Sequence, residues 1–520
     1  MGSLNQSFHD ADQLLRKIIS MPDSELSKLF TFDGISYWDI SAPFLIYSGF
    51  ADAFDRFRLK KEPAVIPKRA GLEFRSKVLR AALAFLAYSG NFRKIDSLLK
   101  PNVLLLGFTN YFSREILHPL YDYMQGGNNG SPLLVNDLVW RGLPQRGQIK
   151  QTHSIWNYWN RSTQKSYAEM LQQLETSRDS LRHSEILKDT IEGHSPGLFP
   201  YLQASLENVL YWTFSRVAAY HVLARQLLVD ASISGVINPD VSDYRTRIFE
   251  AVAMQKNIGT LGVQFGIYGK NDVEWSFFRS HHLAVTGTKN YEIMLQLGVK
   301  PEKMTITGSP RFDFIANMNG DPKPLEEEEK VDKGRKIKIL FASQPFYFGA
   351  FSSPEARIEM IQSLFDAINL FPDLTLLVKP HPVESVEELS ALIQGRPNIS
   401  LINRETDIRH LTLSSDAFVT FFSGSTFEAL ALGKPVMNLA FPSSYVDTVF
   451  IEAEATFIAR NKQDIEKFLT DLTQGDCSTE QEELKKKGKL FLNSWFECSR
   501  GIPSQNISDL MSQYQGRPQV

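Results

Sequence analysis

The sequence predicts an α/β protein built from two parallel-sheet domains. Short apolar runs alternate with segments of helical periodicity along most of the chain, and this alternation is typical of a parallel sheet. The length of 520 residues exceeds what one hydrophobic core supports. The acidic run Glu326–Glu329, which lies between prolines and lysines, divides the alternating series in two. We therefore expect two α/β domains joined by a charged linker.

The apolar runs give the strands of both domains in chain order. Each run is three to six residues long and is bounded by glycine, proline or polar residues. This is expected for a strand that is buried on both faces. The predicted strands of the first domain are 103–107, 133–135, 235–240, 260–264, 283–287 and 303–308, and those of the second are 338–342, 374–378, 399–402, 417–422 and 436–439.

These strands and the helical segments around them divide the chain into five parts. The first part has helical periodicity without strands, and the second contains a long helical insertion between Lys150 and Leu228. The predicted parts are a helical N-terminal extension (1–100), a first Rossmann-like domain for the acceptor (101–320), a linker (321–335), a second Rossmann-like domain for a nucleotide donor (336–490), and a C-terminal helix and tail (491–520).

The overall composition is that of an ordinary soluble protein. Hydrophobic residues make up 43% and charged residues 22% of the chain, and the formal net charge of −3 argues against a dedicated nucleic-acid binder. Cys477 and Cys498 lack metal-ligand spacing, so we expect neither a disulfide framework nor a zinc site.

The localisation expected from the sequence is the cytoplasm. No run reaches the roughly 18 apolar residues that a membrane span needs. Two small basic clusters, Arg56–Lys61 and Lys485–Lys487, leave room for peripheral contact with the inner face of the cell membrane. A solvated surface explains these clusters equally well.

Two turns carry most of the functional information. Lys379-Pro380-His381-Pro382 ends one apolar run, and Ser423–Glu428 ends another about forty residues later. In a doubly wound sheet such turns line the ligand crevice at the carboxyl ends of the strands. A hydroxyl-rich turn at a helix N-terminus offers N–H groups and hydroxyl donors to a phosphate, and Glu428 is placed to accept hydrogen bonds from a ribose diol. The predicted nucleotide-binding residues are Lys379, His381, Ser423, Ser425, Thr426 and Glu428.

Each of these features has an ordinary structural explanation as well. A histidine between prolines is more often a rigid loop residue than a ligand. Ser425 is an ordinary N-cap residue, and Glu428 at the third position after it could complete a capping box. The occurrence of both turns after apolar strands of one domain favours the anion site.

Four segments resemble a known class of transferases. The class is the GT-B glycosyltransferases of surface-polysaccharide synthesis that carry a His-Pro motif, such as capsule Kdo transferases, bacterial sialyltransferases and CDP-glycerol glycerophosphotransferases. The resemblance spans about residues 235–440 and does not extend to the first 100 residues. The matching segments are KMTITGSPRFD (Lys303–Asp313), FASQP (Phe341–Pro345), LLVKPHP (Leu376–Pro382) and SGSTFEALALGKPV (Ser423–Val436).

The resemblance implies two Rossmann-like domains that face a cleft. No Asp-x-Asp metal motif stands near a strand end, so we expect helix N-terminal amides, His381 and Lys379 to stabilise the leaving group without a metal. The resemblance also implies that a sugar or sugar-like group passes from a nucleotide-activated donor to a cell-surface glycan or lipid-linked acceptor, without a cofactor. The donor would be CMP- or CDP-linked, while UDP and other nucleotides stay open. By the same resemblance, His381, Ser423, Ser425 and Thr426 contact the donor's phosphates and nucleotide, and Glu428 faces the ribose.

One departure from the class concerns proton transfer. Many relatives carry a Gln-His-Gly turn where this chain has Gln264-Phe265-Gly266, and Phe265 cannot transfer a proton. Asp240, which follows a strand of the first domain, is the candidate general base, and Asp243 and Glu274 are alternatives. An Asx turn, or an N-cap for the helix that begins near Ser242, is the more common role of an aspartate in such a position.

Three further residues are second-rank candidates for donor contact, and two other functions stay open. The second-rank residues are Ser309, Arg311 and Ser343. A UDP-N-acetylglucosamine 2-epimerase-like enzyme would share the architecture, but the strand-end loops of the first domain are poor in the expected Asp-Arg-x-x-Glu pattern. A non-catalytic nucleotide-binding or interaction protein is the third reading, and Phe265 and the helical extension favour it.

Overall fold

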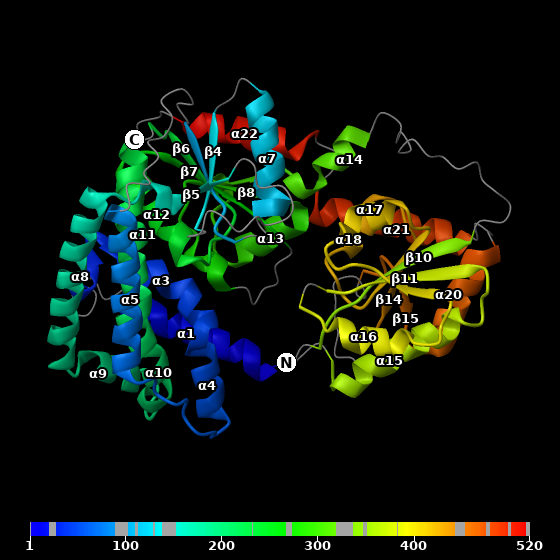
Figure 1. The fold of residues 1–520 in the computed structure, drawn as a ribbon, viewed down its shortest axis with the longest axis horizontal. Coiled ribbons are helices and arrows are strands. Elements are labelled where there is room, and N and C mark those ends of the chain that lie inside the picture. Colours follow the sequence, from blue (N-terminus) through cyan, green and yellow to red (C-terminus); the bar gives the residue numbers. More distant parts are fainter. Residues whose placement is uncertain are drawn as a thin grey trace. The chain divides into compact units, whose positions relative to one another are not determined.

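The computed structural model divides into two compact units, which are described separately here (Figure 1). The first unit comprises Met1–Asp313 and Arg500–Val520, and the second comprises Phe314–Ser499. The structure describes residues 2–19, 28–88, 102–109, 113–127, 131–137, 152–230, 232–266, 273–318, 336–346, 351–381, 383–442, 453–474, 479–497 and 501–515. The predicted linker 321–335 lies outside these residues.

The second unit contains a six-stranded parallel sheet of the doubly wound type. The strand order is β12-β11-β10-β13-β14-β15, so the order reverses between β10 and β13. The strands are β10 (Ile337–Ala342), β11 (Leu374–Lys379), β12 (Ile399–Leu401), β13 (Ala417–Thr420), β14 (Val436–Leu439) and β15 (Phe457–Ala459). The helices are α15 (Pro354–Ile368), α16 (Val386–Ile393), α17 (Ile408–Leu413), α18 (Thr426–Ala431), α20 (Lys462–Gln474) and α21 (Thr479–Trp495).

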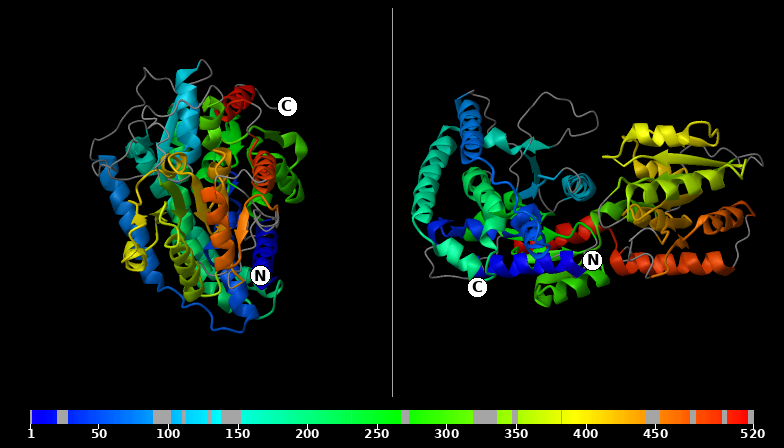
Figure 2. Two further views of the ribbon diagram at one scale, coloured as in Figure 1. Left: turned by 90° about the vertical axis from the view of Figure 1, so that its right-hand side faces the viewer. Right: turned by 90° about the horizontal axis from the view of Figure 1, so that it is seen from below.

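Both faces of this sheet are covered, which explains why its strands are continuous apolar runs. Along β10, Ile339 and Phe341 belong to one buried cluster, whereas Leu340 and Ala342 belong to another. Alternate residues of a strand point to opposite faces, so each cluster lies on one side of the sheet. Figure 2 shows the helices of this unit on both sides of the strands.

The first unit contains a seven-stranded parallel sheet with the order β5-β4-β3-β6-β7-β8-β9. The strands are β3 (Val103–Leu106), β4 (Pro132–Asn136), β5 (His153–Ser154), β6 (Gly235–Asn238), β7 (Gly259–Val263), β8 (His282–Val285) and β9 (Met304–Ile306). Its helices after the first strand include α7 (His118–Gly126), α8 (Arg161–Arg182), α9 (Ile186–Glu192), α10 (Phe199–Asn208), α11 (Phe214–Asp230), α12 (Tyr244–Gln255) and α13 (Thr288–Gln296). The predicted α/β class and its two Rossmann-like sheets are confirmed.

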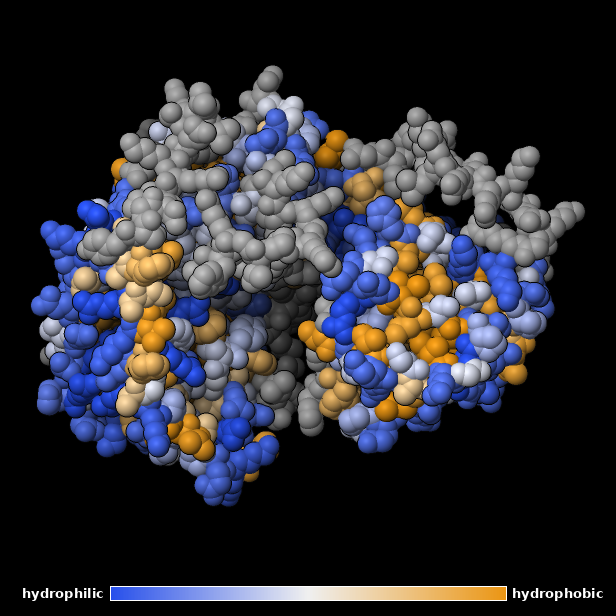
Figure 3. Space-filling view, viewed as in Figure 1, coloured by the Kyte–Doolittle hydropathy of each residue, from blue (hydrophilic) through white to orange (hydrophobic). Residues whose placement is uncertain are grey.

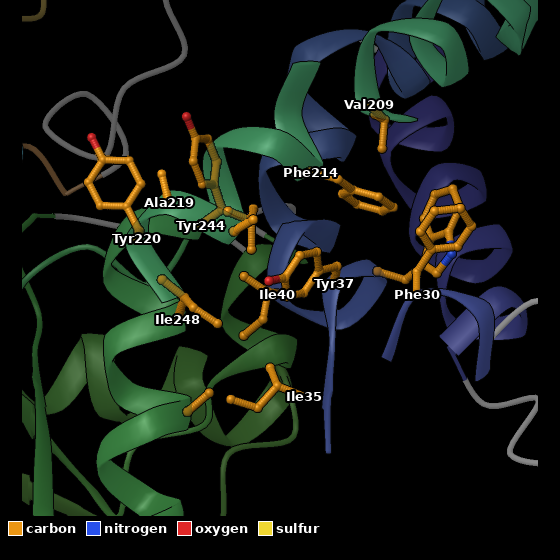
Figure 4. Packing of buried hydrophobic residues seen from close by; sticks show 14 of the residues in the cluster. Phe30, Ile35, Tyr37, Ile40, Val209, Phe214, Ala219, Tyr220, Tyr244 and Ile248 are labelled. Atoms are coloured by element: carbon orange, nitrogen blue, oxygen red, sulfur yellow. The ribbon is translucent and has the colours of Figure 1, made fainter. Parts of the chain in front are cut away.

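The N-terminal helices belong to the same core as the helical insertion. Figure 4 shows Phe30 and Tyr37 packed against Phe214 of α11, and the Tyr37 and Phe214 ring centroids are 5.8 Å apart. The cluster also extends to β3 and β4. The described part of 1–100 is therefore one compact body with the first sheet. Its elements are α1 (Gly2–Ile19), β1 (Thr31–Phe32), β2 (Ile35–Ser36), α3 (Tyr37–Leu45), α4 (Ala51–Arg58) and α5 (Arg69–Tyr88).

The end of the chain returns to the first unit. Helix α22 (Pro503–Tyr514) packs on α7 and β7. Ser504 in the first turn of α22 donates a hydrogen bond of 3.1 Å from its N–H to the Asp313 carboxylate. The Asn506 side chain donates to the Thr307 carbonyl at 3.0 Å. The predicted C-terminal segment 491–520 is thus divided between the units, because the end of α21 packs in the second unit and α22 packs in the first.

We expect Gly259→Ala to destabilise the first unit. A Cβ atom at Gly259 would lie 2.5 Å from the Tyr514 carbonyl oxygen, which is rigid helical backbone. Overpacking of this kind costs about 1–3 kcal/mol in the free energy of unfolding, and denaturant titration measures it. The control is Gly126→Ala, since no atom lies within 4 Å of a Cβ there. Equal stability of the two variants would show that α22 does not pack on β7.

Candidate functional site

The loop after β11 contains the predicted Lys379 and His381. Lys379 is the last residue of the strand, is buried, and donates a hydrogen bond of 2.8 Å from Nζ to the Arg404 carbonyl. Arg404 in turn donates to the Glu384 carbonyl at 3.0 Å. The loop is therefore tied to the segment after β12. Pro382 lies outside the described residues.

The His381 imidazole is half-buried, and its surroundings favour the neutral form. Burial lowers its pKa, and the neighbouring Lys379 charge lowers it further, while Glu384 acts in the opposite direction. The Val383 N–H lies 3.4 Å from Nδ1. Acceptance at Nδ1 favours the tautomer that carries its proton on Nε2, so His381 can donate one hydrogen bond from Nε2.

A buried ion pair that the sequence analysis missed holds this loop. Glu384 and Arg357 of α15 have side-chain exposures of 1% and 3%, and their charged groups contact each other directly. Glu384 Oε2 accepts the His381 N–H at 2.9 Å, and its Oε1 accepts the Ser343 hydroxyl at 2.7 Å. The second-rank candidate Ser343 therefore orients Glu384. No short motif marks Glu384 or Arg357, since each is one charged residue in an ordinary helical or turn context.

Gln344 extends the same network to the third strand-end loop. Its carbonyl accepts a hydrogen bond of 2.7 Å from Arg357 Nε, and its side-chain Oε1 accepts the Phe422 N–H at 2.9 Å. The loops after β10, β11 and β13 are thereby connected by buried polar groups at the carboxyl ends of their strands. This is the edge of the sheet where the strand order reverses.

The Ser423 turn is built by its own hydroxyl groups. Ser423 Oγ accepts the Ser425 N–H at 3.2 Å and lies 3.0 Å from Ser425 Oγ. Its carbonyl accepts the Thr426 N–H at 3.0 Å. Thr426 is fully buried, and its hydroxyl has no hydrogen-bond partner in the described part of the chain.

Glu428 lies deeper than the sequence analysis expected. The side chain is 1% exposed, as part of helix α18. The alternative capping box is not formed, because Ser425 caps no helix N–H through its side chain. Contact of Glu428 with a ribose stays a prediction, and it requires a ligand that reaches into this interior position.

In the first unit, Asp240 follows β6 and forms the Asx turn that was its alternative explanation. Its Oδ1 accepts the N–H groups of Ser242 and Asp243 at 3.1 and 3.2 Å, and its Oδ2 accepts the Thr109 hydroxyl at 3.1 Å. Burial, and then the neighbouring Asp243 charge, raise the pKa of Asp240. A carboxylate with a raised pKa is a better general base, so the turn and the catalytic role are compatible.

Asp243, an alternative base, is committed to other contacts. It caps α12 by accepting the Arg245 N–H at 2.8 Å, and it forms an ion pair with the same arginine. Arg245 also pairs with Asp137, which accepts the Tyr220 hydroxyl at 3.0 Å. Figure 4 shows the hydroxyl groups of Tyr220 and Tyr244 on the same side of the aromatic cluster. The carboxyl ends of β4 and β6 therefore present polar and aromatic groups together.

The remaining candidates of the first unit are buried in its interior or pack against it. Glu274 is buried and accepts a hydrogen bond from the Tyr47 hydroxyl. Phe265 packs against the apolar cluster that contains α22. The second-rank Ser309 and Arg311 are both buried, and the Arg311 guanidinium lies 5.8 Å from the Phe312 ring centre.

Comparison with known families identifies the class of protein. Residues 279–513 match the family CDP-Glycerol:Poly(glycerophosphate) glycerophosphotransferase. The His381 and Ser423 turns lie within the matched residues. The match covers somewhat less than half of the chain. It confirms the resemblance to surface-polysaccharide transferases, and the chain is a nucleotide-dependent transferase. No curated protein matches the sequence significantly.

Solved structures with a similar overall course of the chain share little sequence. A structure of the wall teichoic acid polymerase TagF with CDPG has 15% identity and a TM-score of 0.47, with 86% of this chain and 96% of that chain covered. The S. aureus MnaA-UDP structure has 15% identity and a TM-score of 0.46, with 80% and 96% covered. UDP-GlcNAc 2-epimerase from Neisseria meningitidis has 14% identity and a TM-score of 0.44, with 79% and 100% covered.

The described residues also bear on metal binding and on membrane crossing. They contain no group of three or more His, Cys, Asp or Glu side chains that could hold a metal ion. None of their helices combines the length and apolar character that crossing a bilayer requires. Metal-independent transfer stays a prediction.

We expect Arg357→Met to destabilise the second unit strongly. The variant leaves the Glu384 carboxylate buried without its partner, which costs about 3–5 kcal/mol in the free energy of unfolding. The double variant Arg357→Met/Glu384→Gln should recover much of this loss, because no charge is then stranded. Urea unfolding measures both.

The matched control is Arg396→Met. Arg396 pairs with Asp366 at 2.6 Å, but the Asp366 side chain is 48% exposed, so its loss should cost about 1 kcal/mol or less. An Arg357→Met variant as stable as Arg396→Met would contradict the buried ion pair.

Proposed function

We propose that this transferase moves a sugar or sugar-like group, glycerophosphate included, from a CMP- or CDP-linked donor to a cell-surface glycan or lipid-linked acceptor. The observation that carries the proposal is the fixed position of His381 at the carboxyl end of β11, next to the strand reversal and inside the segment that matches the family. The name of that family makes CDP-glycerol the first donor to test.

The second unit supplies stabilisation of the leaving phosphate. Nε2 of His381 donates one hydrogen bond, and the hydroxyls of Ser423, Ser425 and Thr426 offer others from a rigid turn. Donors that are already fixed before reaction lose little energy in reorganisation when charge develops on the phosphate. Lys379 adds a positive charge close to His381. In this proposal no metal ion is needed to neutralise the leaving group.

The first unit supplies the base in this proposal. The acceptor hydroxyl must lose a proton as it attacks, and Asp240 accepts that proton through an oxygen that already binds polar hydrogens. The raised pKa of Asp240 brings it closer to the working pH, which increases its strength as a base. The base must be ionised to act, so transfer should increase with pH until Asp240 has lost its proton.

We expect His381→Ala to lower kcat for transfer from CDP-glycerol by about a hundredfold or more, as for the loss of one preorganised donor. The fold should persist, because the imidazole is half-buried in a loop; unchanged thermal unfolding would verify this. His410→Ala in α17 is the control and should transfer at the normal rate. Normal turnover by the His381 variant would remove its proposed role.

Measurements of nucleotide binding and of product formation distinguish the proposed transferase from the two alternative functions. Calorimetry with CMP, CDP and UDP should show selective binding of a cytidine nucleotide. Epimerisation of UDP-N-acetylglucosamine without transfer would identify the epimerase-like enzyme. Nucleotide binding without product under any acceptor would identify an interaction protein on the same fold.

Two substitutions beside Asp240 should shift the pH profile of kcat/KM in opposite directions. Asp243→Asn keeps an N-cap side chain but removes the charge that raises the pKa of Asp240, so the acidic limb should move to lower pH. Thr109→Val removes a hydrogen bond that favours the ionised form, so the limb should move to higher pH. A profile that neither variant moves would restrict Asp240 to its Asx turn.

A further inference from the structure

Helix α5 of the first unit exposes a continuous apolar face. Phe74, Val78 and Phe85 are 66%, 51% and 74% exposed, and Ala81 and Ala82 are exposed beside them. The 3.6-residue helical period places these residues on one side of α5. Figure 3 shows the corresponding band of apolar residues on the surface along this helix. In the segment before the helix, Val65 is also exposed, at 93%.

The opposite side of α5 is fully used in the fold. Leu72, Leu83 and Ala87 are buried in the core of the first unit. The Ser76 hydroxyl donates to the Tyr211 carbonyl at 2.6 Å, and Arg69 forms an ion pair of 2.9 Å with Glu207. The exposed band is therefore a second apolar face on a helix that is already anchored. A helix with two apolar sides usually contacts an apolar environment on each of them.

Basic residues border the exposed face on both sides. Arg75 lies along one edge and Lys77 along the other, by the same helical period. Both are exposed, and neither forms an ion pair with the described part of the chain. Lys68 at the start of the helix is also exposed. A large apolar band between unpaired cations is complementary to a surface that is apolar inside and anionic outside.

This charge pattern favours a lipid surface over a protein partner. The apolar face matches the acyl region of a bilayer, and the cations match anionic headgroups. The two basic clusters predicted from the sequence are weaker candidates, because ion pairs occupy part of each. Arg56 pairs with Asp52 and Arg58 with Asp10, and Lys487 pairs with Glu454.

We propose that α5 is a docking face for an anionic lipid surface, with Phe74, Val78 and Phe85 inserted among the headgroups and Arg75 and Lys77 bound to their phosphates. The inference deepens the proposed function, because a lipid-linked acceptor would lie at such a surface. Binding itself does not depend on turnover, so it can be tested separately.

The test is flotation of the full chain with vesicles of phosphatidylcholine, with and without phosphatidylglycerol. We expect binding to the vesicles that contain phosphatidylglycerol, weakened by salt. The variant Phe74→Ser/Phe85→Ser should bind at least about tenfold more weakly, because it loses the insertion of two aromatic rings. Arg75→Gln/Lys77→Gln should lose about fivefold per charge on anionic vesicles only.

The matched control is Leu490→Ser, which removes an exposed leucine, 64% exposed, from α21 in the second unit. It should bind vesicles as the unchanged protein does. All variants should unfold at the same temperature, since every substituted side chain is exposed. Transfer to a water-soluble acceptor should also be unaffected by Phe74→Ser/Phe85→Ser, which distinguishes a failure of docking from a failure of the proposed reaction.

Two outcomes would overturn the proposal. Absence of vesicle binding, or equal binding by Phe74→Ser/Phe85→Ser, would show that α5 is not the docking face. Light scattering that finds a dimer in the unchanged protein, and a monomer in that variant without vesicle binding, would assign the face to a second copy of the chain.

Discussion

The candidate donor site depends on the buried ion pair between Arg357 and Glu384. Two charges that leave water are costly unless their remaining hydrogen-bonding groups are also satisfied. Here Glu384 accepts from the His381 N–H and from the Ser343 hydroxyl, and Arg357 donates to the Gln344 carbonyl. The pair is thus stable only with the loops after β10 and β11 in one arrangement, and the Gln344 side chain connects that arrangement to the loop after β13. The position of His381 is therefore set by the interior of the second unit, before any nucleotide binds.

The parts predicted from sequence are those that local patterns determine. Strands buried on both faces are continuous apolar runs, so both sheets were visible before their pairing was known. The His381 and Ser423 turns follow such runs directly. By contrast, Ser343 and Glu384 are 41 positions apart, and Gln344 and Phe422 are 78 apart. No local pattern marks a polar residue whose partner is this distant, so the sequence did not predict the network, although it predicted the neighbouring candidate residues.

Asp240 shows why a structural explanation does not exclude a catalytic one. The Asx turn holds the carboxylate by backbone N–H groups, which stabilise its ionised form, while burial and Asp243 oppose ionisation. The balance of these effects is what tunes a general base. From the sequence the two explanations are alternatives, because a local pattern indicates the turn but does not indicate the burial of the carboxylate. Phe265, which cannot transfer a proton, packs against an apolar cluster. This packing gives the phenylalanine a structural role at a position where many relatives have a histidine.

The sequence of helix α5 also leaves open which of its two apolar sides is buried. Its sequence alone is that of a core helix, since apolar residues occupy two opposite sides. The structure supplies a core for only one of them, through Leu72, Leu83 and Ala87. Leaving Phe74 and Phe85 in water forgoes about 1.5–3 kcal/mol for each fully buried side chain, so an unoccupied face of this size is a cost to the protein. The basic residues along its edges limit the environments that could offset that cost, and an anionic lipid surface satisfies both requirements at once.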